Sequence, residues 1–320
     1  MPTSKRRVRV TLLAGGVGAA RFLRGLAGLV DPDRLTVIVN TGDDDTFYGL
    51  HVSPDLDTIV YTLAGLAPRK RGWGIQGDGH RLEHALATYY GRPWFRIGDR
   101  DLATHIYRTD RLGQGIPLSR CTREIAQRLG VRQRILPATD DRLRTYVRTT
   151  RGRLAFQQYL VKYGARPRVL GIEYAGARRA RPAPGTVEAI ERADAVLIAP
   201  SNPLVSIRPI LAVAPIRRAL ERARSKTVAV SPLVHGRAVK GPLDRMLRQM
   251  GFGATTATIA RFYSRYASAL IVEPGDGRAS AGPAPLRILE HPTVMHGTSS
   301  ARRLAAFALA AVLEPARSSS

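Results

Sequence analysis

Five aspartates lie close together after an apolar, β-branched run at residues 35–39. They fall within fifteen positions, at Asp43, Asp44, Asp45, Asp55 and Asp57. Crowded carboxylates repel one another unless a hard cation or a network of hydrogen-bond donors neutralises them. A strand that ends in an acidic, glycine-containing loop is also typical of the ligand-binding edge of a parallel sheet. The segment therefore predicts a magnesium-type site for a phosphorylated or nucleotide substrate.

Two kinds of chemistry and one structural role are open to these carboxylates. Magnesium prefers one or two carboxylates together with waters and substrate phosphates, and Asp44, Asp55 and Asp57 are the predicted metal ligands. Such a metal neutralises phosphates and fixes the geometry of an attack on phosphorus. A carboxylate can also accept the proton of an attacking hydroxyl, which makes Asp57 and Asp44 the predicted catalytic residues. Capping of a helix that begins near Thr58 accounts for one aspartate but not for all five.

A glycine turn lies upstream, where Gly15, Gly16 and Gly18 connect a predicted strand to a helical pattern. Backbone N–H groups and the dipole at a helix N-terminus bind phosphate oxygens, so these glycines are predicted to face the phosphates of a nucleotide. The dinucleotide-binding fingerprint continues with a third small residue, and Arg21 stands in that place. Its bulk and charge weaken the case for a nicotinamide cofactor. The structural alternative is a tight strand–helix turn without a ligand.

Two further loops follow apolar runs of the same kind. Ser201 and Asn202 come after the run at residues 195–199, and Ser231 comes after the run at residues 227–230. Hydroxyl and amide groups at the carboxyl ends of strands can contact a base or a ribose. For Ser201 and Asn202, helix capping is an equally good interpretation.

The segment FRIGDRDLATHIYR gathers charged residues in a short stretch: Arg96, Asp99, Arg100, Asp101, His105 and Arg108. If a helix begins near Asp99, then Asp101 and His105 lie on the same face. These residues could form either a phosphate clamp or a surface lattice of ion pairs. Taken alone, they favour the lattice. His105 has no partner at a spacing typical of metal ligands.

Short buried strands are expected to position these residues. Four apolar runs have the length of parallel strands: Val8–Ala14, Leu35–Thr41, Ala195–Ala199 and Thr227–Val230. The first two enclose a helical segment and form a βαβ unit, whose crossover is right-handed. A helix is expected over Ile207–Ala223, bent or divided by Pro215, and another over residues 301–314. Tyr146–Thr150 and Leu154–Gln158 predict a hairpin.

The chain is predicted to have an α/β fold, with a Rossmann-like, mostly parallel sheet, helices on both faces and a smaller, mainly helical insertion. Residues 68–136 are the predicted insertion, because they are polar, arginine-rich and helix-like. The catalytic α/β domain then consists of residues 7–67 and 137–314. Residues 1–6 and 315–320 are expected to be flexible tails.

Charge is the unusual feature of the composition. The chain has 50 basic and 25 acidic residues, and only five of the basic residues are lysines. The arginines are scattered and aromatic residues make up 6% of the chain, so a general arginine bias is favoured over a nucleic-acid groove. Cys121 is the only cysteine, which excludes an intrachain disulfide. The apolar runs are too short to span a bilayer, and a cytoplasmic enzyme is expected.

Several motifs together resemble the 2-phospho-L-lactate transferase family, which makes the deazaflavin coenzyme F-420. The match runs in order over most of the chain, as AGGVGAARFLRGL, VIVNTGDD, GLHVSPDLDTIVYTLAG, RGWG, GDRDLATHIYRT, ILPATDD, IAPSNPLVSI and VSPLVHG. The SPDLDT, GDRDxATH and PSNP elements are specific in combination, whereas the glycine turn alone is not. Asp45 and the Thr46-Phe47-Tyr48 run stand where family members vary, so they are assigned no role.

The resemblance implies a transfer reaction that uses magnesium. The family moves a phospho-hydroxyacid unit from a GDP-linked donor to the ribityl hydroxyl of 7,8-didemethyl-8-hydroxy-5-deazariboflavin (Fo), and it releases GMP. It implies that Asp57 and Arg96 bind the deazaflavin, while Gly15 to Gly18, Ser201 and Asn202 face the donor nucleotide. The acid carried is phospholactate, phosphoenolpyruvate or phosphoglycerate, and no residue in the sequence selects among them. The family's tendency to pair favours a homodimer.

Three other functions compete with the transferase. A related family of non-catalytic nucleotide-sugar-binding regulators shares the glycine turn and the paired aspartates, but has a Gly-Gly-Ser-Ser run where this chain has DTFYGLHVSPDLDT. A nicotinamide dehydrogenase is disfavoured by Arg21 and by the lack of a hydride-transfer constellation. A nucleic-acid binder rests on net charge alone, and salt-dependent binding to random DNA would support it.

Overall fold

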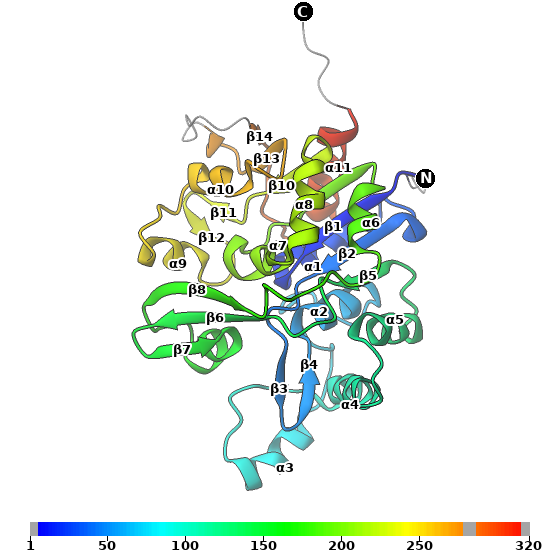
Figure 1. Ribbon diagram of the computed structural model, residues 1–320, viewed down its shortest axis with the longest axis vertical. Helices are drawn as coiled ribbons and strands as arrows, with labels where there is room; N and C mark the ends of the chain where they lie inside the picture. The colour runs from blue at the N-terminus through cyan, green and yellow to red at the C-terminus, as the bar shows by residue number, and fades with distance from the viewer. Residues whose placement is uncertain (1–5, 278–285, 315–320) are drawn as a thin grey trace, which may run out of the picture.

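The computed structural model describes residues 6–277 and 286–314. Its centre is a seven-stranded sheet in which every pair of neighbours is parallel, with the order β14–β13–β10–β9–β1–β2–β5 (Figure 1). In chain order the strands are β1 Val10–Ala14, β2 Leu35–Val39, β5 Arg134–Pro137, β9 Ala195–Ile198, β10 Thr227–Val230, β13 Ala269–Val272 and β14 Arg287–Glu290. The four predicted strands are confirmed, and β5, β13 and β14 extend the sheet at its two edges.

Helices cover both faces of this sheet (Figure 1). On one face, Leu12 of β1 packs in an apolar cluster with residues of α1 Gly16–Leu26 and α11 Thr298–Leu313. On the other face, Leu13 packs in a second cluster with residues of α8 Ala214–Arg222. Successive side chains of a strand point to opposite faces, so a strand with both faces buried must be apolar throughout. The predicted α/β class, with a Rossmann-like parallel sheet, is confirmed.

The acidic segment is a hairpin and a helix start rather than one loop. β3 Asp45–Phe47 and β4 Leu50–Val52 pair antiparallel and project from the sheet toward α3 Arg81–Tyr90 (Figure 1). α2 Pro54–Leu63 begins four residues before Thr58, so the predicted start of this helix was wrong. Proline suits the first helical position, and acidic residues in the first turn interact favourably with the helix dipole.

Residues 68–136 contain α3, α4 Asp99–Gly113 and α5 Leu118–Arg128. The end of this range belongs to the central sheet, because β5 pairs with β2. Its RILP run is too short to produce a periodic signal, and the boundary predicted at residue 136 therefore cuts through a strand. The division into domains stays a prediction. Of the predicted tails, 1–6 and 315–320, only Arg6 lies within the described residues.

The remaining elements are a small antiparallel sheet, a short hairpin and several short helices. The predicted hairpin is confirmed as β6 Arg144–Thr149 and β7 Gly152–Ala155, and β8 Val169–Ala175 extends it to three antiparallel strands. The helix expected over Ile207–Ala223 is divided, as predicted, into α7 and α8, with the break at Val213 and Pro215 in the first turn of α8. A π-helical turn precedes α7. The other bounds are α6 Thr186–Glu191, a π-helix Gln158–Lys162, a π-helix Pro203–Ile207, α7 Arg208–Ala212, β11 Leu233–Val234, β12 Arg237–Ala238, α9 Leu243–Gln249 and α10 Thr256–Tyr263. Within the described residues, no helix has both the length and the apolarity needed to cross a membrane.

Candidate functional site

A cavity of about 690 Å³ opens at the carboxyl ends of the central strands. Its walls include the residues that follow β1, β2, β9 and β10, as Gly15, Asp43, Pro200 and Ser231. Ligands of open α/β sheets bind in this crevice. The predicted site residues that line the cavity are Gly15, Gly16, Gly18, Asp55, Asp57, Arg96, Ser201 and Asn202. Asp44 is the one predicted site residue that does not line it.

The glycine turn packs against neighbouring loops. Its backbone conformation and this packing explain why Gly16 and Gly18 are glycines. Gly16 has φ +74°, a conformation that favours glycine, and a Cβ on Gly18 would lie 2.3 Å from the carbonyl oxygen of Pro200. The hydroxyl of Ser201 donates to the carbonyl of Gly15 at 2.8 Å. The N–H of Gly16 donates to Oδ1 of Asp55 at 2.8 Å, so a phosphate at this amide must displace the carboxylate.

Asn202 caps a helical turn, which was one of the two roles predicted for it from the sequence. Its side-chain oxygen accepts a hydrogen bond from the N–H of Leu204 at 2.9 Å, at the start of the π-helical turn. The amide nitrogen of Asn202 faces the sulfur of Met246 at 3.9 Å. Asn202 therefore organises the loop after β9 and lines the cavity at the same time.

Three buried carboxylates form an acidic cluster at the end of β2, made of Asp43, Asp44 and Asp55. The side-chain amide of Asn40 donates to Asp43 at 3.2 Å and to Asp55 at 2.9 Å. Burial, the charge of Asp55 and the charge of Asp44 raise the pKa of Asp43 well above its ordinary value, against the Asn40 hydrogen bond. Burial is also the main cause that raises the pKa of Asp55 to about 6. The acidic cluster therefore has too few hydrogen-bond donors to neutralise the charge of its carboxylates.

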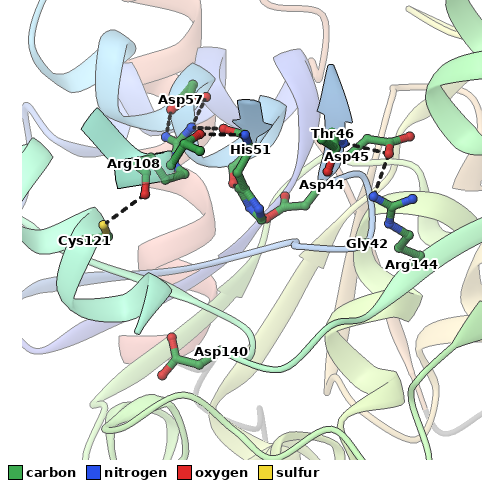
Figure 2. A network of polar contacts seen from close by, with 12 residues as sticks. Gly42, Asp44, Asp45, Thr46, His51, Asp57, Arg108, Cys121, Asp140 and Arg144 are labelled. Carbon is green, nitrogen blue, oxygen red and sulfur yellow. Dashed lines mark hydrogen bonds and ion pairs between the residues drawn. The ribbon is translucent and has the colours of Figure 1, made fainter. Parts of the chain in front are cut away.

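Asp44 lies behind the cavity wall, between two partners from β4 and its end. Oδ2 of Asp44 accepts a hydrogen bond from Ser53 at 2.7 Å and lies 3.2 Å from Nε2 of His51. Burial raises the pKa of Asp44, and the hydrogen bonds from His51 and Ser53 oppose this shift. Oδ1 of Asp44 is buried and has no hydrogen-bond partner in the part of the chain that the structure describes. The neighbouring Asp45 is paired with Arg144 at 2.6 Å, away from this group (Figure 2).

The raised pKa of Asp55 predicts a pH-dependent stability. The folded protein keeps this proton at pH values where the unfolded chain has lost it, so stability should decrease as the pH rises from about 4 to about 6. Asp55→Asn should remove up to about 3 kcal/mol of this decrease. Urea unfolding of both proteins in EDTA at several pH values measures the difference.

Asp194→Asn provides the matched control for this titration. Asp194 has a pKa lowered by hydrogen bonds from Arg9, so its substitution should change the pH dependence in the opposite direction. An Asp55→Asn protein with the same pH dependence as the natural chain would contradict the burial of an under-neutralised carboxylate.

Asp57 belongs to a different group, because a buried arginine neutralises it. Arg108 of α4 has a relative exposure of 1%, and its Nη1 donates to Oδ2 of Asp57 at 3.2 Å while Nη2 donates to Oδ1. Figure 2 shows the guanidinium between Asp57 and the backbone of His51. Burial alone would lower the pKa of Arg108, but the charge and the hydrogen bonds of Asp57 raise it overall.

The same helix face brings Asp101 and His105 to Asp57. Nε2 of His105 lies 3.4 Å from Asp101, Nδ1 of His105 lies 3.7 Å from Asp57, and Tyr61 donates to Asp101 at 2.7 Å. Three side chains thus come close enough to bind a metal ion together. The potential metal-ligand atoms of Asp57, Asp101 and His105 all lie within 4.8 Å of one another. The spacing of residues around His105 could not reveal this group, because Asp57 comes from another helix.

The surface lattice favoured for this segment was also wrong. His105 and Arg108 are each about 1% exposed. Sequence reasoning missed Arg108 as a site residue. The available signal was the spacing of Asp101, His105 and Arg108, at i, i+4 and i+7, which places all three on one helix face. Asp99 does not join them, because it accepts from the N–H groups of Arg81 and Leu82 at the start of α3.

Arg96 also lines the cavity, from the segment before α4. Its side chain is 55% exposed and pairs with Glu83 of α3 at 3.1 Å. The guanidinium is thus available to a ligand that enters the cavity. Asp57 and Arg96, which the sequence resemblance links to one substrate, line the same space.

The sequence matches one protein family over most of the chain. A family model described as 2-phospho-L-lactate transferase CofD matches residues 10–281. The chain belongs to the 2-phospho-L-lactate transferase family. It is therefore a phospho-acid transferase of coenzyme F-420 biosynthesis that acts on small-molecule substrates.

Relatives within this family are similar over most of their length. A phosphoenolpyruvate transferase from Nocardia farcinica is 43% identical over 263 residues, which cover 80% of this chain and 79% of the relative. Another from Streptomyces griseus is 45% identical over 261 residues, with coverage of 80% and 82%. A UPF0052 family protein from Bacillus halodurans has a similar structure, with TM-score 0.62, 15% identity and coverage of 96% and 100%. That likeness concerns the fold alone.

The acidic cluster of this 2-phospho-L-lactate transferase family member fits a magnesium ion. Asp43, Asp44 and Asp55 offer hard oxygen ligands, and the buried Oδ1 of Asp44 has no hydrogen-bond partner among the described residues. A divalent cation would offset the burial, and the smaller mutual repulsion, that raise the pKa values of Asp43 and Asp55. Asp57 fits less well as a ligand, because Arg108 already neutralises it. Magnesium ligation by Asp44, Asp55 and Asp57 stays a prediction, and the contacts favour the first two.

Proposed function

We propose that this chain transfers a phospho-hydroxyacid unit from a GDP-linked donor to the ribityl hydroxyl of Fo, with F-420-0 or its variant and GMP as products. The reaction belongs to the transferases of substituted phosphate groups, the 2.7.8 class, and uses magnesium. The unit is 2-phospho-L-lactate, phosphoenolpyruvate or 3-phosphoglycerate. The names of the relatives favour phosphoenolpyruvate.

One observation supports this proposal most strongly. A single cavity is lined by the glycine turn, by Asp43 and Asp55 of the under-neutralised acidic cluster, and by Asp57 and Arg96. Transfer between two bound substrates needs one site for a diphosphate and another for the accepting hydroxyl within the same enclosed space. A volume of about 690 Å³ is within the range of sites for cofactor-sized ligands.

In the proposed reaction, the ribityl oxygen attacks the phosphorus that bears the acid. A new O–P bond forms, the bond from that phosphorus to the bridging oxygen of GMP breaks, and GMP leaves with the electron pair. Asp57 accepts the hydrogen bond and then the proton of the hydroxyl. Arg108 fixes the orientation of the Asp57 carboxylate through two hydrogen bonds, which limits motion of the base before the attack.

The remaining residues bind and orient the substrates in this proposal. Arg96 contacts the deazaflavin, and Gly15 to Gly18, Ser201 and Asn202 line the donor nucleotide. Asp44 and Asp55, with Asp43 beside them, hold the magnesium ion. When bound, this ion would neutralise the diphosphate charge. A cytoplasmic location and a homodimer complete the proposal, and light scattering of the purified protein tests the dimer.

A product assay tests the function directly. Purified protein is incubated with Fo, Mg²⁺ and each of the three GDP-linked donors, and the products are identified by mass spectrometry. The expected result is a phosphodiester of Fo together with GMP, formed fastest with the phosphoenolpyruvate donor. Absence of an Fo adduct with all three donors would contradict the proposal.

Arg96→Ala should weaken Fo binding about 10-fold or more, while GDP binding changes less than about twofold, because a charge-assisted hydrogen bond contributes roughly 1.5–3 kcal/mol. Fluorescence titration of Fo and calorimetry of GDP measure the two affinities. Arg100→Ala is the matched control, since Arg100 is exposed, donates to the carbonyl of Gln76 and does not line the cavity. A larger loss for GDP than for Fo would count against the assignment of Arg96.

A further inference from the structure

Two cationic side chains line the cavity but have no role in the reaction proposed above. Arg21 of α1 and Lys240, from the loop before α9, both line the cavity. Nη2 of Arg21 donates to the carbonyl of Lys70 at 3.0 Å, and Nζ of Lys240 donates to the carbonyl of Arg71 at 2.8 Å. One peptide segment thus holds the two cations next to each other.

These cations lack acidic neighbours. In the described part of the chain, neither Arg21 nor Lys240 has a carboxylate at ion-pair distance, and the first turn of α1 contains no acidic residue. Partial burial and the charge of Arg21 lower the pKa of Lys240. Burial and the charges of Arg69 and Arg21 likewise lower the pKa of Arg24. Like charges gathered in this way favour an anion between them.

Arg21 is also the residue that departs from the dinucleotide fingerprint. It stands where a small residue would allow close packing of a helix on its strand, yet its helix packs fully, with Phe22 and Leu23 buried beside it. Helical side chains lean toward the N-terminus of their helix, which directs Arg21 toward the glycine turn. The side chain thus adds a positive charge to the same helix end that presents backbone N–H groups.

We propose that Arg21 and Lys240 form a binding site for an oxyanion of the donor, either a phosphate of its diphosphate or the carboxylate of its acid. The cavity then contains groups of opposite charge. Asp43 and Asp55 attract a cation, Asp57 accepts the hydrogen bond of the attacking hydroxyl, and Arg21 and Lys240 hold an oxyanion of the donor. The inference extends the proposed transferase function and names the residues that select an anionic donor.

Binding measurements on three charge-removing variants test this site. Arg21→Gln and Lys240→Gln are compared with Arg24→Gln, which removes the same charge from the same cluster but does not line the cavity. Calorimetry with pyrophosphate, GDP and guanosine, all with Mg²⁺, gives the affinities, and circular dichroism verifies the fold. Lys240 lies in an exposed loop, so its variant keeps the test open if Arg21→Gln does not fold.

If the site binds phosphate, the two cavity variants should bind pyrophosphate and GDP about 10- to 100-fold more weakly. Guanosine binding and the Arg24→Gln protein should stay within about twofold. If the site binds the carboxylate, GDP affinity should be unchanged, and the KM for the complete donor should rise about 10-fold or more. Either result supports the oxyanion site.

Unchanged GDP affinity together with unchanged donor KM in folded Arg21→Gln and Lys240→Gln proteins would overturn the inference. An equal loss in Arg24→Gln would also overturn it, because the effect would then be general electrostatics. If the natural protein forms no Fo adduct, the pyrophosphate titrations still decide whether the site binds phosphate, and calorimetry with the complete donor decides whether it binds the carboxylate. Failure of the transfer reaction is therefore distinguishable from failure of this site.

Discussion

Asp57→Asn should reduce transfer by about 100- to 10,000-fold, the range expected when a general base is removed. The amide cannot accept the proton of the ribityl hydroxyl, although it keeps nearly the same shape. Single-turnover measurements with saturating donor and Fo give the rate of the chemical step. Near-normal turnover would exclude Asp57 as the base.

The structure adds a cost in stability to this substitution. Asp57 is the ion-pair partner of the buried Arg108, and the neutral amide leaves that guanidinium without a counter-charge. The free energy of unfolding should therefore also fall by up to about 3–5 kcal/mol. Assays below the unfolding temperature of the variant separate lost chemistry from lost fold.

Asp45→Asn is the matched control for Asp57→Asn. Asp45 lies in the same run of aspartates and is also paired with an arginine, Arg144, but it does not line the cavity. Its substitution should cost some stability and leave the rate of the chemical step within about twofold. A loss of rate comparable with that of Asp57→Asn would mean that activity depends on general charge in this segment.

Arg108→Met should produce the largest loss of stability, about 3–5 kcal/mol, because it leaves Asp57 buried without its partner. Urea unfolding at neutral pH measures this change. Activity should fall as well, since the free carboxylate is no longer oriented by two hydrogen bonds. A loss below about 1 kcal/mol would be typical of an exposed pair and would contradict the buried arrangement.

A double-mutant cycle tests whether the two side chains act as one unit. The protein with both Asp57→Asn and Arg108→Met contains neither buried charge, so its loss of stability should be smaller than the sum of the two single losses. The expected interaction energy is within the roughly 0.5–3 kcal/mol observed for contacting residues. Additive losses would indicate that Arg108 stabilises the fold through other contacts.

Local sequence patterns predicted the parts of the site that depend on neighbours along the chain. The strands around Leu12 and Leu197 are mostly apolar because both faces of the sheet are buried, and this pattern can be recognised directly in the sequence. The parallel order then brings Gly15, Asp43 and Ser201 to one edge. Gly15 and Ser201 were predicted as site residues for this reason, and both line the cavity. Asp43 was not predicted, because the position of a residue in the acidic segment does not show that Asp43 faces the cavity and Asp44 does not.

Contacts between distant segments could not be predicted in this way. Asp57 and Arg108 are separated by 51 positions, and the amide of Gly16 meets Asp55 across 39 positions. Whether a charge is buried depends on which helix packs over it, and a local pattern of charges does not contain that information. The charged face of α4 consequently resembled a surface lattice, although Arg108 lies in the interior.

A crystal structure with GDP and Mn²⁺ in place of Mg²⁺ tests the central claim most directly. The account predicts an anomalous peak at the carboxylates of Asp44 and Asp55, with the diphosphate between this ion and the glycine turn. Asp55 should then have left the N–H of Gly16, with which it forms a hydrogen bond in this structure. GDP bound elsewhere, or a cavity without the ion at saturating Mn²⁺, would contradict the account.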